Sequence, residues 1–233
     1  MFEIVFISYK EPNAEDNWNR LRSRFPLAKR VNGVKGIKHA HIKAAEMCWT
    51  KMFWVVDGDA EILEDFDFSY KPTEWDLDTV HVWHAKNPIN DLVYGYGGVK
   101  LLPTKLTKSM DRTVIDLATS ISPKFKVIEE ISNITAFNTD PFNTWKSAFR
   151  ECAKLSSKII VRQESGETDE RLNTWTTAGG DREFGEYAIR GALAGMEFGL
   201  SRRNDLGLIN DFKWLKDHYN NTINRTDMEN NND

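Results

Sequence analysis

Residues 52–63 read MFWVVDGDAEIL, a dense apolar run that stops at Asp57, Gly58 and Asp59. A continuous apolar run is typical of a strand that is buried on both faces of a parallel sheet. The two carboxylates then follow the carboxyl end of that strand, where open α/β sheets bind their ligands. Acids at this point suit Mg²⁺ or Mn²⁺, which bind carboxylate oxygens together with substrate phosphate. The alternative interpretation is a solvated acidic turn.

The chain before this run alternates between strand and helix patterns. Its apolar periodicity predicts a strand, a helix, a short strand and a second helix at residues 2–8, 14–25, 28–31 and 37–50. Followed by the strand at residues 52–56, this order is the beginning of a doubly wound sheet. We therefore predict an α/β fold with a Rossmann-like, mixed, mostly parallel sheet flanked by helices.

The remainder of the chain predicts further strands and helices. Strands are expected at residues 79–85, 125–130 and 134–137, and helices at residues 109–120, 144–160 and 187–198. The segment 92–100, LVYGYGGVK, lacks a following helix in dinucleotide-binding register, and we interpret it as a flexible ligand loop. Residues 220–233 are polar and nearly free of hydrophobic residues, so we expect a disordered tail.

Composition limits the class of protein. The chain has 233 residues, of which 40% are hydrophobic, and no apolar run approaches the ~20 residues that span a bilayer. The N-terminus has no signal-peptide pattern, and Cys48 and Cys152 fit a reduced protein, so we expect a cytoplasmic location and no membrane partner. The net charge of −4 argues against a protein that coats nucleic acid, although basic residues crowd the early chain and a basic face could meet phosphates.

Several sequence blocks carry a resemblance to a known family. In chain order they are FISYKEPNAEDNW, AKRVNGVKGIKHAH, MFWVVDGDAEI, NPINDLVYGYGGVKL, FNTDPFNTWKSAFREC and GGDREFGEYA, and they span roughly residues 2–214. The chain thereby resembles the TET/JBP-associated glycosyltransferases, a family of phage and some eukaryotic proteins with the GT-A fold and a D-x-D motif. The resemblance implies transfer of a sugar from a nucleotide-diphosphate sugar, with a UDP-sugar expected, to a hydroxymethylated pyrimidine such as hydroxymethylcytosine in DNA.

The same resemblance suggests how the chain is organised. It implies a single glycosyltransferase domain at residues 1–219, with the donor bound by residues 1 to about 100 and the acceptor and catalytic groups at about 101–219. Such a protein, if encoded by a phage, would work in the cytoplasm of the bacterial host.

The donor site is expected at the loops that follow neighbouring strands. Asp57 and Asp59 would hold Mn²⁺ or Mg²⁺, which offsets the charge of the diphosphate leaving group. The other residues expected to contact the nucleotide sugar come from these loops and from the glycine-rich segment: Ser8, Tyr9, Asn13, Lys35, Lys38, Gly58, Gly97 and Gly98. For Lys35 the alternative is an exposed lysine.

The acceptor hydroxyl needs a base if the enzyme inverts the sugar configuration. Gly179-Gly180-Asp181 resembles the turn that carries this carboxylate in inverting GT-A enzymes, which makes Asp181 the first candidate and Glu183 and Glu186 the reserves. An aspartate that caps a helix is the alternative for Asp181, and in a retaining enzyme it would orient the sugar or the acceptor. His218 is the candidate third metal ligand, and the alternative is a surface histidine without a role in metal binding.

Three other functions remain open at this stage. A glycosyltransferase could act on a polysaccharide or a protein and would need no DNA-binding face. A nucleotide-sugar-binding module could have lost catalysis, although the paired acids and the GGD turn argue against it. A metal-dependent nucleotidyltransferase would also place acids on a nucleotide-binding sheet, and would release pyrophosphate instead of a nucleoside diphosphate.

Overall fold

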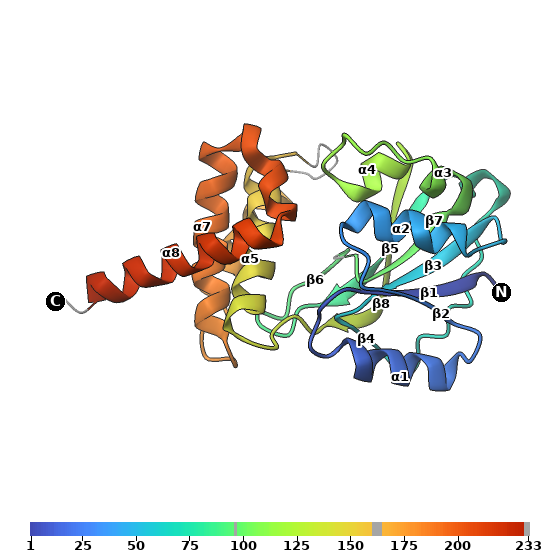
Figure 1. Cartoon of the computed structure of the whole chain (residues 1–233), viewed down its shortest axis with the longest axis horizontal. Coiled ribbons are helices and arrows are strands. Elements are labelled where there is room, and N and C mark those ends of the chain that lie inside the picture. The colour runs from blue at the N-terminus through green and yellow to red at the C-terminus, as the bar shows by residue number, and fades with distance from the viewer. Residues whose placement is uncertain (96, 160–164, 231–233) are drawn as a thin grey trace. The chain divides into compact units, whose positions relative to one another are not determined.

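The computed structural model describes residues 1–95, 97–159 and 165–230, which form two compact units, Met1–Ala136 and Phe137–Asp233 (Figure 1). The chain therefore divides between Ala136 and Phe137, whereas the sequence predicted one domain whose donor-binding part ends near residue 100. Among the described helices, none combines the length and apolar character that a membrane span requires.

A mixed sheet forms the centre of the first unit. In the described part of the chain it has eight strands: β1 (Glu3–Ser8), β2 (Lys29–Asn32), β3 (Met52–Asp57), β4 (Ala60–Ile62), β5 (Val80–Lys86), β6 (Val93–Tyr94), β7 (Val99–Pro103) and β8 (Phe125–Thr135). Their order is β2-β1-β3-β7-β5-β8-β4, and β6 pairs with β5. β1 runs parallel to β2 and β3, and β5 runs parallel to β8, whereas β7 is antiparallel to both of its neighbours. The predicted α/β class, with a mixed sheet flanked by helices, is confirmed.

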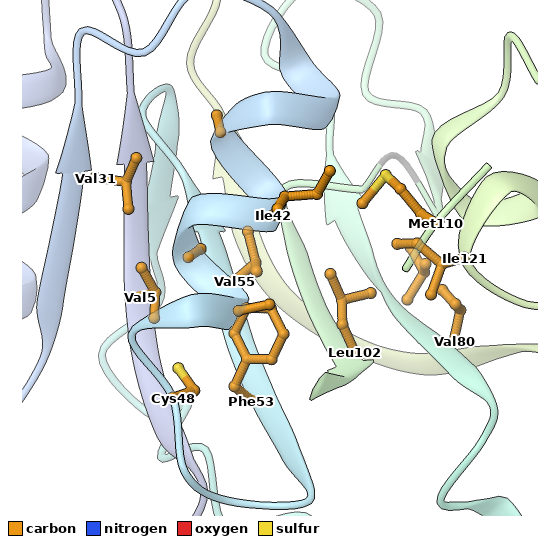
Figure 2. Close-up of a cluster of buried hydrophobic side chains, with 14 residues drawn as sticks. Val5, Val31, Ile42, Cys48, Phe53, Val55, Val80, Leu102, Met110 and Ile121 are labelled. Atoms are coloured by element: carbon orange, nitrogen blue, oxygen red, sulfur yellow. The ribbon is translucent and has the colours of Figure 1, made fainter. Parts of the chain in front are cut away.

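Helices cover both faces of this sheet, α1 (Ala14–Arg24) on one side and α2 (Ile37–Glu46) on the other (Figure 1). Because side chains alternate along a strand, each strand supplies two cores. Val5, Phe53 and Val55 pack with α2, as Figure 2 shows, while Phe6 and Trp54 pack on the α1 side. β3 is buried from Met52 to Val56, which explains its continuous apolar sequence.

A charged clamp joins the amino ends of β1, β2 and β3. Glu3 Oε2 accepts hydrogen bonds from the backbone N–H groups of Trp49 (2.6 Å) and Thr50 (2.9 Å), and Glu3 Oε1 lies 2.5 Å from Lys29 Nζ. Burial disfavours the charged carboxylate, but the hydrogen bonds from Lys29, Thr50 and Trp49 outweigh it and lower the pKa of Glu3 to about 2.

The short elements differ in part from the expectations. A 3-10 helix, η1 (Glu74–Asp76), precedes β5, and α3 (Thr104–Lys108) and α4 (Leu117–Ile121) follow β7. The helix predicted at residues 109–120 is wrong for its first part, because only α4 is helical there. The two strands predicted at 125–130 and 134–137 are one continuous strand, β8, which pairs with β5 across an irregular register.

The second unit is helical. Its elements are α5 (Pro141–Ser156), α6 (Ser165–Thr177), α7 (Gly185–Ser201), the 3-10 helix η2 (Arg203–Asn210) and α8 (Phe212–Asn230). The sequence predicted no element in the polar segment 163–172, yet α6 begins at Ser165; residues 160–164 lie outside the described residues. The tail expected to be disordered from Asn220 belongs to α8 as far as Asn230, and residues 231–233 are again outside the described residues.

Glycines set the distance between α5 and α7. Gly191, Gly195 and Gly199 lie one turn apart on α7, and a Cβ at each would overlap a backbone carbonyl oxygen of α5. At Gly195 the added atom would also lie 2.8 Å from the carbonyl carbon of Phe149. The two helices therefore touch backbone to backbone at these points, without an intervening layer of side chains.

Candidate functional site

The acidic turn lies at the carboxyl edge of the parallel strands. Asp57 is the last residue of β3, and the register pairs Ile7 with Asp57 and Ser8 with Asn32. Three strand ends therefore meet at one edge, as the sequence predicted for a ligand site. Asp57 and Asp59 are both half-buried. Alternation along β3 places the Asp57 side chain on the same face as Val55, the face covered by α2.

A buried lysine holds Asp57. Lys100 Nζ lies 2.9 Å from Asp57 Oδ1 and 2.8 Å from Oδ2, and it also donates to the carbonyl oxygen of Gly97. Lys100 comes from β7, which pairs antiparallel with β3 in a register that sets Val55 opposite Lys100. The sequence analysis missed this residue, although a lysine within the apolar run Val99–Pro103 signals a buried charge that needs a partner.

The loop after β1 packs on Gly58. Asn17 Nδ2 donates to the Gly58 carbonyl oxygen (3.0 Å), and a Cβ at Gly58 would lie 2.7 Å from Glu11 Oε2. Glu11 Oε2 in turn accepts a hydrogen bond from the Tyr9 backbone N–H (2.7 Å). Neither Glu11 nor Asn17 was predicted as a site residue, although both lie in the first block of the family resemblance. A larger residue at Gly58 would therefore require the Glu11 side chain to move.

Ser8 and Asn13, which were also expected to contact the donor, form hydrogen bonds that fix the first loop in the fold. The Ser8 hydroxyl donates to Asn32 Oδ1 (3.0 Å) and accepts from Arg30 Nε (3.2 Å). Asn13 Nδ2 donates to the carbonyl oxygen of Ala136 (2.9 Å), and its buried Oδ1 has no hydrogen-bond partner in the described part of the chain. Ser8 is thus the last residue of β1, Tyr9 and Asn13 lie in the loop that follows it, and their contact with a nucleotide sugar stays a prediction.

The two lysines expected near the phosphates have different environments. Lys35 is exposed in the loop between β2 and α2. Lys38 Nζ donates to the carbonyl oxygens of Arg112 (2.7 Å) and Val114, so its ammonium ties α2 to the segment before α4. The structure therefore gives Lys38 a fold-stabilising role, and its contact with phosphate stays a prediction.

The glycines before β7 meet the acidic turn. The Gly98 carbonyl oxygen accepts a hydrogen bond from the Asp57 backbone N–H (2.9 Å). A Cβ at Gly98 would lie 2.6 Å from Nδ2 of the buried Asn133, and Gly97 has a φ of 91°, which favours glycine. The structure thus brings Gly98 to Asp57. The interpretation of residues 92–100 as a flexible loop is wrong in part, because the segment contains β6 and the start of β7, and donor binding by Gly97 and Gly98 stays a prediction.

The candidate bases lie in the second unit, Asp181 and Glu183 in the loop between α6 and α7 and Glu186 in the first turn of α7. Asp181, Glu183 and Glu186 are exposed. The N-cap residue of α7 is Phe184, and Asp181 lies four residues before the first helical residue, so the helix-capping alternative for Asp181 is wrong. Turns link Gly179 to Arg182 and Arg182 to Gly185 by backbone hydrogen bonds of 3.1 and 2.8 Å. Asp181 therefore belongs to a tight loop.

His218 lies in an aromatic cluster of the second unit. Its ring stacks on Trp214 with centroids 4.8 Å apart, and Phe149 and Trp145 approach it at 5.3 and 5.9 Å. Within the ranges that the structure describes, no three His, Cys, Asp or Glu side chains are grouped as a metal site. The metal ligands, His218 included, stay a prediction. The donor atoms of the acidic turn, carboxylate oxygens, are of the type that Mn²⁺ and Mg²⁺ prefer.

Comparison with known proteins adds little to these observations. No protein-family model matches the chain, and no curated protein matches it. One solved structure is described as "crystal structure of a glycosyltransferase involved in the glycosylation of the major capsid of PBCV-1". The alignment covers 55% of this chain and 82% of the chain in that structure. The sequence identity is 11% and the TM-score is 0.34, a similarity too low to carry a conclusion about family or activity.

Proposed function

We propose that this chain is a glycosyltransferase that transfers a sugar from a nucleotide-diphosphate sugar, expected to be a UDP-sugar, to a hydroxymethylated pyrimidine base in DNA. The observation that carries the proposal is the turn of Asp57, Gly58 and Asp59 at the carboxyl edge of β3. Asn17 donates to the carbonyl oxygen of Gly58 and Lys100 holds the carboxylate of Asp57, so the turn is held at two points. A fixed acidic turn at this edge suits a nucleotide diphosphate.

The chemistry on the donor side is the loss of a nucleoside diphosphate. A bound Mn²⁺ or Mg²⁺ supplies positive charge that offsets the negative charge building on the phosphate oxygens. We assign Asp59 to hold the cation together with the donor phosphates, beside Asp57, whose two oxygens accept hydrogen bonds from Lys100. Asn17 keeps the Gly58 carbonyl in place, so the turn needs no rearrangement when the donor binds.

On the acceptor side, Asp181 is the proposed base. Its exposed carboxylate would take the proton of the acceptor hydroxymethyl group as the oxygen attacks the anomeric carbon. If the reaction retains the sugar configuration, Asp181 instead orients the acceptor. Glu183, exposed two residues later, is the reserve candidate.

Aromatic rings beside basic side chains in the second unit support the nucleic-acid acceptor of this proposal. In the second unit, Lys216 Nζ lies 4.2 Å and Lys146 Nζ 5.5 Å from the ring centroid of Phe142. Lys146 and Arg150 approach the partly exposed ring of Phe212 at 5.1 and 5.7 Å. Aromatic side chains among basic groups are the combination that binds single-stranded nucleic acid, and they suit a base taken out of its stack.

The test is a transfer assay with a panel of nucleotide sugars, Mn²⁺, and DNA with or without hydroxymethylated pyrimidines. Mass spectrometry of the digested nucleosides should show a hexose or pentose added only to the hydroxymethylated base, with release of nucleoside diphosphate. Release of pyrophosphate would identify a nucleotidyltransferase instead. Donor consumption with a saccharide or protein acceptor, but not with DNA, would overturn the acceptor assignment.

Matched variants separate the assigned roles. Asp59→Asn should abolish transfer, whereas Asp205→Asn, which changes an exposed ion pair with Arg202 in the second unit, should leave it unchanged. Wild-type rates in Asp59→Asn would refute the assigned site. Unchanged donor binding in a protein without any transfer would support a non-catalytic binding module.

A further inference from the structure

Lys100 is a buried cation within an apolar strand. Its side chain is 8% exposed, and its neighbours Val99, Leu101 and Leu102 are fully buried. Burying an ammonium is unfavourable unless its donors find acceptors. Here three acceptor atoms surround it: both carboxylate oxygens of Asp57 and the carbonyl oxygen of Gly97. The pair is therefore built into the fold, and Asp57, at 34% exposure, is its more accessible member.

The pair changes the net charge that the turn presents. The ammonium of Lys100 offsets the negative charge that the carboxylate of Asp57 would otherwise contribute to the turn. The nearby His41 on α2 cannot replace that positive charge, because burial, and then the charge of Lys100, lower its pKa to about 3. His41 Nδ1 is 2.7 Å from the Ile37 carbonyl oxygen, which assigns the proton of the neutral ring to Nδ1. The ammonium of Lys100 is therefore the positive charge that the geometry places beside Asp57.

We propose that Lys100 is a positioning residue that withholds Asp57 from the divalent cation, so that the cation binds this turn strongly only together with the diphosphate of the donor. The inference rests on the proposed function for the identity of the donor. A doubly charged ion gains little from the carboxylate of Asp57 while the ammonium of Lys100 lies 2.8 Å from it. The donor diphosphate brings the additional negative oxygens. Metal and nucleotide sugar are therefore expected to bind as a unit.

The experiment measures Mn²⁺ binding to the full chain by electron paramagnetic resonance of the free ion, without any nucleotide. Lys100→Met should tighten Mn²⁺ binding at least tenfold, because it releases the Asp57 carboxylate. Lys100→Arg keeps the charge and the paired geometry and should stay within threefold of the wild type. Lys105→Met, which removes an exposed lysine on α3, is the matched control and should also stay within threefold. UDP or a UDP-sugar, added in a second titration, should tighten Mn²⁺ binding to the wild type at least tenfold.

A double variant keeps the proposal falsifiable if Lys100→Met does not fold. Asp57→Asn combined with Lys100→Met removes both charges, leaves no buried ion without a partner and keeps the net charge of the turn. If Lys100 withholds Asp57, the double variant should bind Mn²⁺ within threefold of the wild type. A tenfold loss would show that Asp57 is already a metal ligand and would overturn the proposal.

The remaining outcomes separate this inference from the proposed function. Equal Mn²⁺ affinity in the wild type and a folded Lys100→Met variant overturns the inference, even if the protein transfers sugar. Absence of Mn²⁺ binding in every variant also overturns it. If Lys100→Met tightens Mn²⁺ binding but no nucleotide sugar is consumed, the proposed function fails while the role of Lys100 stands.

Discussion

Replacing Glu3 by glutamine tests the charged clamp at the amino ends of the first three strands. Glutamine keeps the size of the side chain but lacks the negative charge that binds Lys29. It also has one acceptor oxygen where glutamate has two. The pKa of Glu3 falls from 4.5 to about 2 in the folded protein. At 1.36 kcal/mol per pKa unit this corresponds to an upper bound of about 3 kcal/mol. Because the side chain is 22% exposed, solvent screening reduces the expected loss on Glu3→Gln to about 2 kcal/mol.

The sign of the pH dependence follows from a lowered pKa. The charged carboxylate stabilises the folded state fully above pH 4.5, and this contribution is lost as the pH falls toward 2. Urea unfolding should therefore show the wild type more stable than Glu3→Gln at pH 7, with a difference that narrows between pH 4.5 and 2. Amide hydrogen exchange of β1, β2 and β3 assigns the effect to this unit.

A matched control is available on the same unit. Glu46 forms an exposed pair with Lys43 at 3.6 Å, so Glu46→Gln should change stability by no more than about 0.5 kcal/mol. Equal stability of Glu3→Gln and the wild type at pH 7 would refute the clamp. A difference that stays constant from pH 7 to pH 3 would show that packing, and not charge, explains it.

Three further predictions follow from the described geometry. Gly195→Ala places a methyl group against the backbone of α5 and should destabilise the second unit by about 2–3 kcal/mol in thermal unfolding. The control Gly166→Ala, whose added Cβ would have no atom within 4 Å, should be neutral or slightly stabilising. Equal effects of the two substitutions would contradict the backbone contact. Asp181→Asn should lower kcat by ~10²–10⁴-fold with little change in donor KM, and an unchanged kcat would remove it as the base. Cys48, buried and with a pKa raised to about 12 by burial, should resist a thiol reagent at pH 8 until the protein is unfolded; rapid native labelling would disprove its burial.

The sequence was most informative where a local pattern and the tertiary environment agree. The apolar run before Asp57 predicts a strand buried on both faces, and β3 ends at Asp57 as expected. The partner of that acid was not predictable in the same way, because Lys100 lies 43 residues further along the chain and reaches Asp57 through an antiparallel register. Registers of distant strands depend on packing that no local pattern encodes.

The sequence also predicted some helices and helix ends poorly. α6 was missed because most of its segment is polar, while the residue that anchors it in the core, the fully buried Trp175, lies near its end. The sequence placed Asp181 in a turn after two glycines and left a helix cap as the alternative. In the structure α7 begins after Phe184, whose backbone is in the left-handed conformation, so Asp181 does not cap the helix. A cap depends on backbone angles, which residue types bias but do not decide.

The glycine contact between α7 and α5 limits which substitutions α7 can accept. At Gly191, Gly195 and Gly199, any other residue would place its Cβ against a backbone carbonyl group of α5. Leu193 and Leu200 on the same helix are exposed, so substitutions there should be tolerated. A mutational scan of α7 should therefore show intolerance with a period of four residues. In chains too divergent for overall alignment, this spacing downstream of a Gly-Gly-Asp turn would serve as a search signature for descendants of the same ancestor.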